Sequence, residues 1–373
     1  MPRIPQFQPY IGEKEYESIK SCFDDNWITE GPKSKEFVRR LCELIGVKYG
    51  VLAPNGTLSL YMGLRALGIG PGDEVLVPNF TFIASANAVE MCGAKPVFVD
   101  IREDLHIDIK ACEKLLTRRT KAIMPVHIYG MACDMTAVMK FAKENSLKVI
   151  EDAAQAIGVK WDDKSAGSFG DVGSFSFFAD KTITTGEGGL VVTDDKTVYE
   201  KLLYMRNQGR IDRGSFVHPE IGYNFRMTDI QSAIGLTQLD KLPEIIQKKA
   251  EILKTYKKLL DVKIPIIEPG PHSNHIPFRV CIMIKGGSQG LIKHMADNDI
   301  ETRTFFYPLH KQPCYAKKPG FKLLASLNAV FGNDSEFSVS DRVYNEGVCL
   351  PSFVGITREQ IEYVCQKINE YEL

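Results

Sequence analysis

Short apolar runs alternate with longer amphipathic stretches over the first half of the chain. The apolar runs are rich in Val and Ile, as buried strands are, and they stand at residues 49–55, 73–78, 95–100, 120–130 and 147–153. The stretches between them carry apolar residues at helical spacing, mostly up to a Gly or Asn, at residues 58–68, 83–93, 108–116 and 134–145. This alternation predicts an α/β fold with a mainly parallel central sheet and helices on both faces.

The pattern becomes less regular in the second half of the chain. Two more strands are predicted at 174–178 and 189–195, then helices at 196–206 and 228–239 and a charged helical bridge at 240–260. Three prolines then interrupt regular structure, and a later strand and a closing helix indicate a small α+β unit, at residues 264–274, 278–284 and 358–372. We therefore predict a large domain, which includes the N-terminal segment and the bridging helix, and a small C-terminal domain: residues 1–260 and 261–373.

Composition and charge narrow the class of protein. The chain has 373 residues, a formal net charge of −1 and 44 % hydrophobic residues, which is typical of a globular protein without a basic footprint for nucleic acid. No apolar run approaches the ~20 residues that span a bilayer, and the first ten residues lack a signal-peptide core. The nine cysteines form no Cys-x-x-Cys pair and no Cys/His spacing typical of zinc, so we expect reduced thiols, no metal site and a cytoplasmic protein.

Polar residues follow two of the predicted strands, where ligands of open α/β sheets bind. Gly56 and Thr57 stand between a strand and a helix, and free N–H groups there suit a phosphate, although Thr57 could also be a plain helix cap. Glu151 and Asp152 end another strand. They are either helix-capping groups or, for Asp152, an anion that holds a proton on a heteroaromatic nitrogen.

Lys181 stands between the apolar run SFSFF and the glycine-rich run TITTGEGG. Most lysines are solvated surface groups. A lysine beside a phosphate site and an aspartate, however, can form a Schiff base with an aldehyde cofactor. The order of phosphate turn, aspartate and lysine is more specific than any one of these elements and favours the second interpretation.

At this point the chain resembles the fold-type I, pyridoxal phosphate (PLP) dependent aminotransferases of the DegT type, which aminate keto sugars. The resemblance runs essentially end to end, from NWITEGPKSKEF to IETRTFFYPLHKQPCY. The motifs FTFIAS, VHIYG, GDVGSFSFF, KTITTGEGG and GYNFRMTDIQSAIG most resemble the branch that converts GDP-4-keto-6-deoxymannose to GDP-perosamine. The sequence FADK departs from this branch, in which a Gly-Asn pair is expected before the lysine.

The resemblance implies a role for each matching residue. Lys181 matches the lysine that bonds the cofactor and moves the proton, and Asp152 matches the partner of the pyridine nitrogen. The other cofactor contacts implied are Phe82 on the ring, Gln155 near the phenolic oxygen, a phosphate cradle of Gly56, Thr57 and Ser176, and Asn224 from a neighbouring subunit. Substrate contacts implied are Trp27, Thr29, Arg226, Arg303, Tyr307 and His310. His127, in VHIYG, either lines the cleft or fills core space.

The resemblance also implies the reaction, with alternatives. We expect a homodimer with shared active sites that uses L-glutamate as amino donor, passes through pyridoxamine phosphate (PMP), and aminates C4 of GDP-4-keto-6-deoxymannose. Another nucleotide-linked keto sugar, or the 8-oxo group of an octulosonic acid, is an alternative acceptor. A PLP-dependent sugar dehydratase is a further alternative, but a histidine replaces the Schiff-base lysine in those enzymes. A non-catalytic ligand-binding regulator would be expected to lack Lys181 or Asp152.

Overall fold

The computed structural model describes residues 2–210, 214, 216–317 and 337–371. Its centre is a seven-stranded sheet in the order β1-β9-β8-β5-β4-β2-β3. Strand pairs β2–β3, β2–β4, β4–β5 and β5–β8 are parallel, whereas β9 pairs antiparallel with β1 and β8. The strands are β1 Tyr49–Ala53, β2 Glu74–Pro78, β3 Lys95–Val99, β4 Thr120–Ile123, β5 Lys148–Asp152, β8 Val172–Ser176 and β9 Gly189–Thr193.

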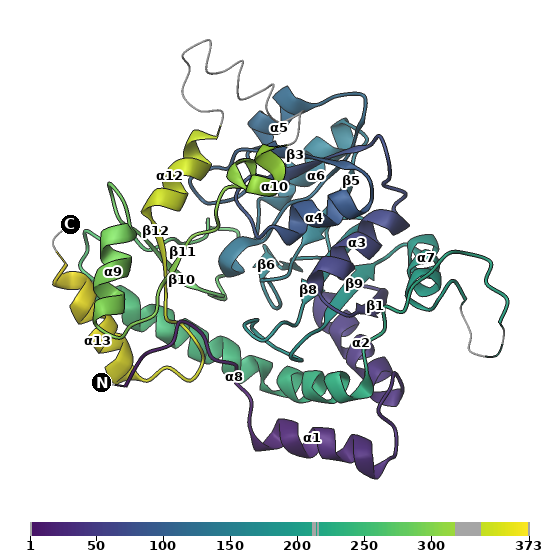
Figure 1. Cartoon of the computed structure of the whole chain (residues 1–373), viewed down its shortest axis with the longest axis horizontal. Helices are drawn as coiled ribbons and strands as arrows, with labels where there is room; N and C mark the ends of the chain where they lie inside the picture. Colours follow the sequence, from purple (N-terminus) through teal and green to yellow (C-terminus); the bar gives the residue numbers. More distant parts are fainter. Residues whose placement is uncertain (1, 211–213, 215, 318–336, 372–373) are drawn as a thin grey trace.

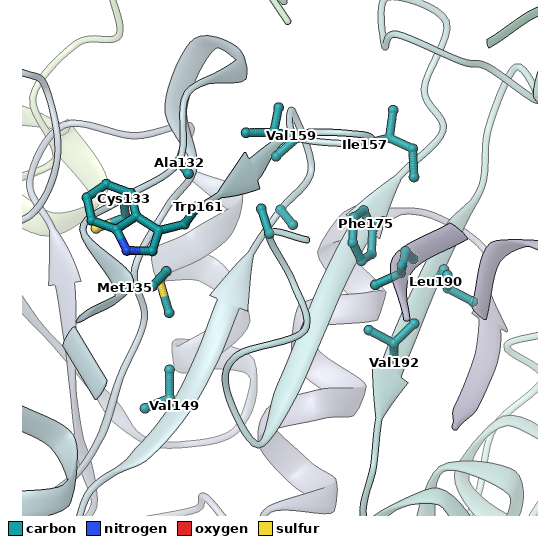
Figure 2. Close-up of a cluster of buried hydrophobic side chains, with 14 of the residues drawn as sticks. Ala132, Cys133, Met135, Val149, Ile157, Val159, Trp161, Phe175, Leu190 and Val192 are labelled. Atoms are coloured by element: carbon teal, nitrogen blue, oxygen red, sulfur yellow. The ribbon is translucent and has the colours of Figure 1, made fainter. Parts of the chain in front are cut away.

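Helices cover both faces of this sheet, because successive strand residues point to opposite sides. On one face, Leu52, Val149 and Phe175 pack with residues of α2, α5, α6 and α8. Figure 2 shows part of this core, in which Val149, Phe175, Leu190 and Val192 come from neighbouring strands. On the other face, the alternate strand residues pack with α3, α4 and α7. The helices on the two faces are α2 Pro32–Ile45, α3 Gly56–Ala66, α4 Ala84–Met91, α5 Ile109–Leu115, α6 Met135–Glu144, α7 Lys196–Arg206 and α8 Asp229–Leu259. The predicted α/β class with a mainly parallel sheet is confirmed.

One long helix replaces the two helical segments predicted at 228–239 and 240–260. Helix α8, Asp229–Leu259, has 31 residues and begins at a capping box on Thr228. Pro243 lies inside it, and a proline removes one helical hydrogen bond. The neighbouring Leu242 and Ile245 are buried in the core of the large sheet, and we attribute the continuity of the helix to this packing. In Figure 1, α8 runs through the lower part of the molecule, above α1, from α2 towards α13.

A smaller three-stranded sheet, β10-β12-β11, lies at the far end of α8 (Figure 1). Its core also takes in Ile4 from the N-terminal segment and Tyr256 from α8, so both ends of the predicted large domain contact it. The division at residue 260 stays a prediction. The elements here are β10 Val280–Met283, α9 Gln289–Asp297, β11 Arg303–Thr304, η2 Leu309–Lys311, α10 Pro313–Ala316, α12 Ser338–Glu346, β12 Gly347–Leu350 and α13 Arg358–Asn369.

Four further elements accompany the large sheet. Helix α1, Glu13–Asp24, packs against α8, and the loop between α1 and α2 carries Trp27 and Thr29. The hairpin of β6 Lys160–Trp161 and β7 Lys164–Ser165 and the single turn η1 Ile128–Gly130 complete the large unit. Among the described residues, no helix combines the length and the apolar character needed to cross a membrane.

Candidate active site

A cleft of about 630 Å³ opens at the ends of strands β5 and β8. The last residues of these two parallel strands, Asp152 and Ser176, line it together with the first turn of α3. This is the edge of an open α/β sheet at which ligands bind. Of the residues predicted at the site, those that line the cleft are Gly56, Thr57, Phe82, Asp152, Gln155, Ser176, Lys181 and Arg303.

The N-terminus of α3 forms one corner of the cleft. Its N-cap is Asn55, whose side chain accepts the N–H of Leu58 at 2.9 Å, so the alternative of Thr57 as the cap is wrong. A Cβ atom on Gly56 would stand 2.8 Å from Cβ of Ser176, and the glycine thus permits this close approach. Backbone N–H groups of a first helical turn, a helix dipole and a serine hydroxyl together suit an anion such as a phosphate.

Asp152 presents a buried carboxylate to the cleft. The hydroxyl of Ser85 donates to its Oδ2 at 2.7 Å, and the N–H of Ala154 donates to Oδ1 at 3.2 Å. Each of the two carboxylate oxygens thus accepts one hydrogen bond from the protein. The carboxylate is therefore both fixed in direction and able to hold a proton on a basic nitrogen.

Lys181 reaches the same cleft from the loop after β8. Two backbone bonds fold this loop back, from Thr185 N–H to the carbonyl of Phe177 at 2.9 Å and from Lys181 N–H to that of Phe178 at 3.0 Å. The Nζ atom lies 4.0 Å from Oδ1 of Asp180. Burial lowers the pKa of the Lys181 amine below its ordinary value, while the charges of Asp180 and Asp152 oppose that shift. A lowered pKa makes the amine a better nucleophile at neutral pH.

Aromatic rings and Gln155 also line the cleft. Tyr129 has a left-handed backbone, with φ of 52°, and its N–H donates to Oε1 of Gln155 at 2.8 Å. This bond fixes the carbonyl end of the Gln155 amide, so the side chain donates through its other end. The ring of Phe306 stacks on Tyr129 with centroids 5.4 Å apart, and Phe82 meets Phe306 at 6.1 Å. A planar ring is the shape of ligand that these side chains accommodate.

A model of the DegT/DnrJ/EryC1/StrS aminotransferase family matches residues 9–369. The chain belongs to this family. It is therefore an enzyme of the transaminase type, acting on small molecules, and PLP is the cofactor expected of it.

Relatives of this aminotransferase cover its whole length. GDP-perosamine synthase of Escherichia coli O157:H7 is 40 % identical over 375 residues, which is 100 % of this chain and 99 % of that protein. GDP-perosamine synthase of Vibrio cholerae is 36 % identical over 375 residues, 99 % of each. Among solved structures, S. venezuelae DesV matches with a TM-score of 0.89 and 28 % identity, covering 99 % of this chain and 98 % of its own. The PLP form of the putative sugar aminotransferase Spr1654 from Streptococcus pneumoniae matches at a TM-score of 0.89 and 26 % identity, covering 98 % of each chain.

The residues of the cleft fit PLP. The first turn of α3 with Ser176 offers donors for the phosphate, and the close approach at Gly56 leaves no side chain in that corner. Lys181 and Asp152 line the same cleft, where an amine could bond the aldehyde of PLP and a carboxylate could partner its ring nitrogen. Within the described residues, no cluster of three or more His, Cys, Asp or Glu side chains is arranged to hold a metal ion.

Six predicted residues of the aminotransferase do not line the cleft of their own chain. Asn224 is exposed and forms an isolated β-bridge with Asn207, whose Oδ1 accepts Nη1 of Arg226 at 2.7 Å. Trp27 donates from Nε1 to the carbonyl of Glu30 at 3.3 Å. Thr29 is exposed, and its carbonyl accepts the N–H at the start of α8. The set is completed by the exposed Tyr307 and the half-buried His310. The roles given to these residues stay predictions.

His310 and His127 are held within the protein. Nδ1 of His310 lies 2.9 Å from Nδ2 of Asn79, and its ring stacks on Phe337 with centroids 4.4 Å apart. His127 is fully buried and bonds to Glu151 at 2.9 Å, so it fills core space rather than lining the cleft.

Several residues that line the cleft were not identified from the sequence, among them Tyr129, Phe278, Asp180 and Arg279. Asp180 had a signal, since it stands in FADK, where the family resemblance leads one to expect an uncharged residue. Arg279 had a weaker one, a charge at the start of the otherwise apolar run of residues 278–284. Their partnership spans 99 positions of sequence, which no local pattern reveals.

Proposed function

We propose that this aminotransferase transfers the amino group of L-glutamate to C4 of GDP-4-keto-6-deoxymannose, which gives GDP-perosamine. The observation that carries the reaction type is the meeting of the Lys181 amine, the Asp152 carboxylate and the α3 N-terminus in one cleft. Support for the sugar comes from full-length relatives named GDP-perosamine synthase in two bacteria. Other nucleotide-linked keto sugars and the octulosonic acid remain outcomes of the test.

PLP, when bound, supplies an aldehyde for amines and a conjugated ring that accepts electrons. In this proposal the N-terminus of α3 and Ser176 hold the phosphate, and Asp152 keeps a proton on the ring nitrogen. The Nζ atom of Lys181 would hold the cofactor at rest. Once free, it would accept the proton from the α-carbon of glutamate and return it to the carbon that carried the aldehyde. Its lowered pKa leaves a larger neutral fraction at neutral pH for both tasks.

We also propose a homodimer in which Asn224 of one subunit reaches the phosphate held by the other. Phe82 at the cleft and Ile221 near Asn224 are 57 % and 87 % exposed in the single chain. Large exposed apolar side chains next to a site mark a contact surface. The roles proposed for Trp27, Thr29, Arg226, Tyr307 and His310 require such a partner or a change of shape, because they lie outside this cleft.

The test is incubation of the PLP-loaded enzyme with L-glutamate and a panel of nucleotide-linked keto sugars, followed by mass analysis of the products. We expect 2-oxoglutarate and an amino sugar, with GDP-4-keto-6-deoxymannose as the preferred acceptor. Lys181→Ala should abolish both products, whereas Lys140→Ala, a surface change on α6, should not. Borohydride reduction and peptide mapping should label Lys181.

Each competing function gives a different result. A deoxygenated sugar without 2-oxoglutarate would indicate a dehydratase. A protein that binds sugar but neither takes up PLP nor turns over would indicate a ligand-binding regulator. A different preferred acceptor would retain the transaminase and replace the sugar.

A further inference from the structure

Asp180 lines the cleft and lies between two cations. Its Oδ2 accepts Nη2 of Arg279 at 2.6 Å, and its Oδ1 lies 4.0 Å from Nζ of Lys181. Both cations also contact the ring of Phe278, with Nζ of Lys181 4.6 Å and Cζ of Arg279 4.4 Å from its centroid. Arg279 is 5 % exposed, so its charge interacts with its neighbours with little screening by water.

Asp180 without Arg279, or Arg279 without Asp180, would change the protonation of the Lys181 amine. A lone carboxylate at 4.0 Å would hold the amine protonated and form an ion pair with it. A lone guanidinium at the same place would repel an ammonium and lower its pKa. Because Arg279 engages one oxygen of Asp180 directly, the carboxylate is shared and cannot turn fully to the lysine.

We propose that Asp180 and Arg279 are a positioning pair that sets the charge state of Lys181 and directs its amine into the cleft. Neither residue touches the reacting atoms in this proposal; both act through Lys181. It rests on the proposed function, because it assigns the pair to the lysine that is proposed to bond PLP. The departure at FADK therefore forms part of the catalytic apparatus of this chain, with Arg279 as its partner.

Other charges face the same group and must be counted. Asp152 acts on Lys181 from the end of β5, and its charge raises the pKa of the amine as that of Asp180 does. The buried Lys249 of α8 donates to the carbonyl of Pro277 at 3.1 Å. The charge of Arg279 lowers the pKa of Lys249, and that of Asp180 raises it. Arg303 on β11 opposes protonation of Arg279. All these groups stay in place when only the pair is altered.

The pair predicts shifts of opposite sign. Asp180→Asn leaves Arg279 beside the lysine, so the pKa of Lys181 should fall. Arg279→Met leaves Asp180 to pair with the lysine, so the pKa should rise. The double variant should return close to the wild type, and Arg279→Lys, which keeps the charge, should shift little. A merely structural pair would instead give two destabilised single variants without opposite shifts.

The measurement is competitive acetylation of the full-length protein without cofactor, with acetic anhydride from pH 6 to 11, and peptide mapping of Lys181. Below the midpoint, Asp180→Asn should react at least about tenfold faster than the wild type and Arg279→Met at least about tenfold slower. Arg358→Met, a surface change on α13, is the matched control. Thermal unfolding checks that each variant is folded.

Association of the same apoproteins with PLP, followed by absorbance, is the second readout. We expect its pH midpoints to move in the same order as those of acetylation. Unshifted midpoints, or shifts of the same sign in both single variants, overturn the pair. If acetylation shifts as expected but no variant bonds PLP at Lys181, the pair stands and the proposed function fails.

Discussion

The imidazole of His127 donates from Nε2 to Oε2 of Glu151 at 2.9 Å, and both side chains are fully buried behind the cleft. The N–H of Cys133 donates to Nδ1 of the same ring at 3.1 Å, which places the proton on Nε2. Glu151 and Asp152 are neighbours on β5, and successive strand residues point to opposite faces. The carboxylate of Glu151 therefore accepts hydrogen bonds inside the core, while that of Asp152 faces the cleft.

Glu151→Gln should destabilise the protein. The two oxygens of Glu151 accept N–H groups of Gly167, Phe169 and Gly170 at 2.8, 2.6 and 2.6 Å, besides the bond from His127. An amide has only one acceptor end, so buried donors lose their partner, which costs about 1–3 kcal/mol or more. Urea unfolding should show this fall in the free energy of unfolding.

Glu144→Gln is the control for that substitution. Glu144 ends α6 and faces Lys140 across 4.0 Å at the surface, where an ion pair contributes at most about 1 kcal/mol. Equal losses for both variants would contradict a bracing role for Glu151.

Gly56→Ala should weaken PLP binding while leaving the fold intact. The new Cβ would stand 2.8 Å from Cβ of Ser176, so one side of the proposed phosphate cradle must move. We expect the dissociation constant for PLP to rise by at least about tenfold, the equivalent of one lost phosphate hydrogen bond. Absorbance titration of the apoprotein measures it.

Gly12→Ala is the matched glycine change, because a Cβ there meets no atom within 4 Å and the backbone is extended at φ of −172°. Unchanged PLP affinity in Gly56→Ala, with unfolding like that of the wild type, would remove the α3 N-terminus from the phosphate site.

The sequence predicts those parts of the fold that repeat locally. Strands such as Lys148–Asp152 are short apolar runs. Gly56, Asp152 and Lys181 each stand at or soon after the end of such a run, and their order along the chain indicates the cleft. Parallel strands bring their carboxyl ends to one edge of the sheet. Residues that follow different strands are therefore expected to lie close together, although they are distant in sequence.

Features that depend on packing escape that kind of prediction. The sequence predicts separate helical segments at 228–239 and 240–260, but α8 is continuous, and residues on either side of Pro243 are buried in the core. Tyr129 adopts a left-handed backbone that its residue type does not favour, and its position becomes clear only with Gln155 beside it. Arg279 donates to Asp180 from 99 positions away in the sequence, and no spacing rule connects the two residues.

Lys249→Met should stabilise the protein in a pH-dependent way. Lys249 is buried, and desolvation lowers its pKa from 10.5 to about 7. Between these values the unfolded chain binds more protons than the folded one, so the wild type gains stability as pH rises. The variant has no such group. Its advantage should be greatest below pH 7 and shrink towards pH 10.5, by up to about 1.4 kcal/mol per pH unit.

Urea unfolding of both proteins at pH 6.5, 8 and 9.5 measures that difference, since the two chains differ in no other titratable residue. Lys140→Met, at the surface of α6, should give a difference that does not vary with pH. A constant difference for Lys249→Met as well would mean that the buried amine stays protonated in the folded protein over this pH range, as it does in the unfolded chain.

Mixing two inactive variants should restore activity if the proposed dimer shares its sites. A Lys181→Ala chain keeps Asn224, and an Asn224→Ala chain keeps Lys181. In a mixed dimer, one cleft then has both residues, provided that Asn224 acts across the interface. Random exchange makes half of the dimers mixed with one intact site each, so roughly a quarter of wild-type turnover should return.

The exchange is performed by mild unfolding and refolding of equimolar chains, and release of 2-oxoglutarate from glutamate reports turnover. The control mixes Lys181→Ala with Asp152→Asn, two residues that line the same cleft of one chain, so no mixed dimer has a complete site. If Asn224 acted within its own chain, the test mixture would stay as inactive as this control. Recovery in the test mixture alone therefore assigns Asn224 to the cleft of the neighbouring subunit. Such a role agrees with its position, because Asn224 is exposed and lies outside the cleft of its own chain.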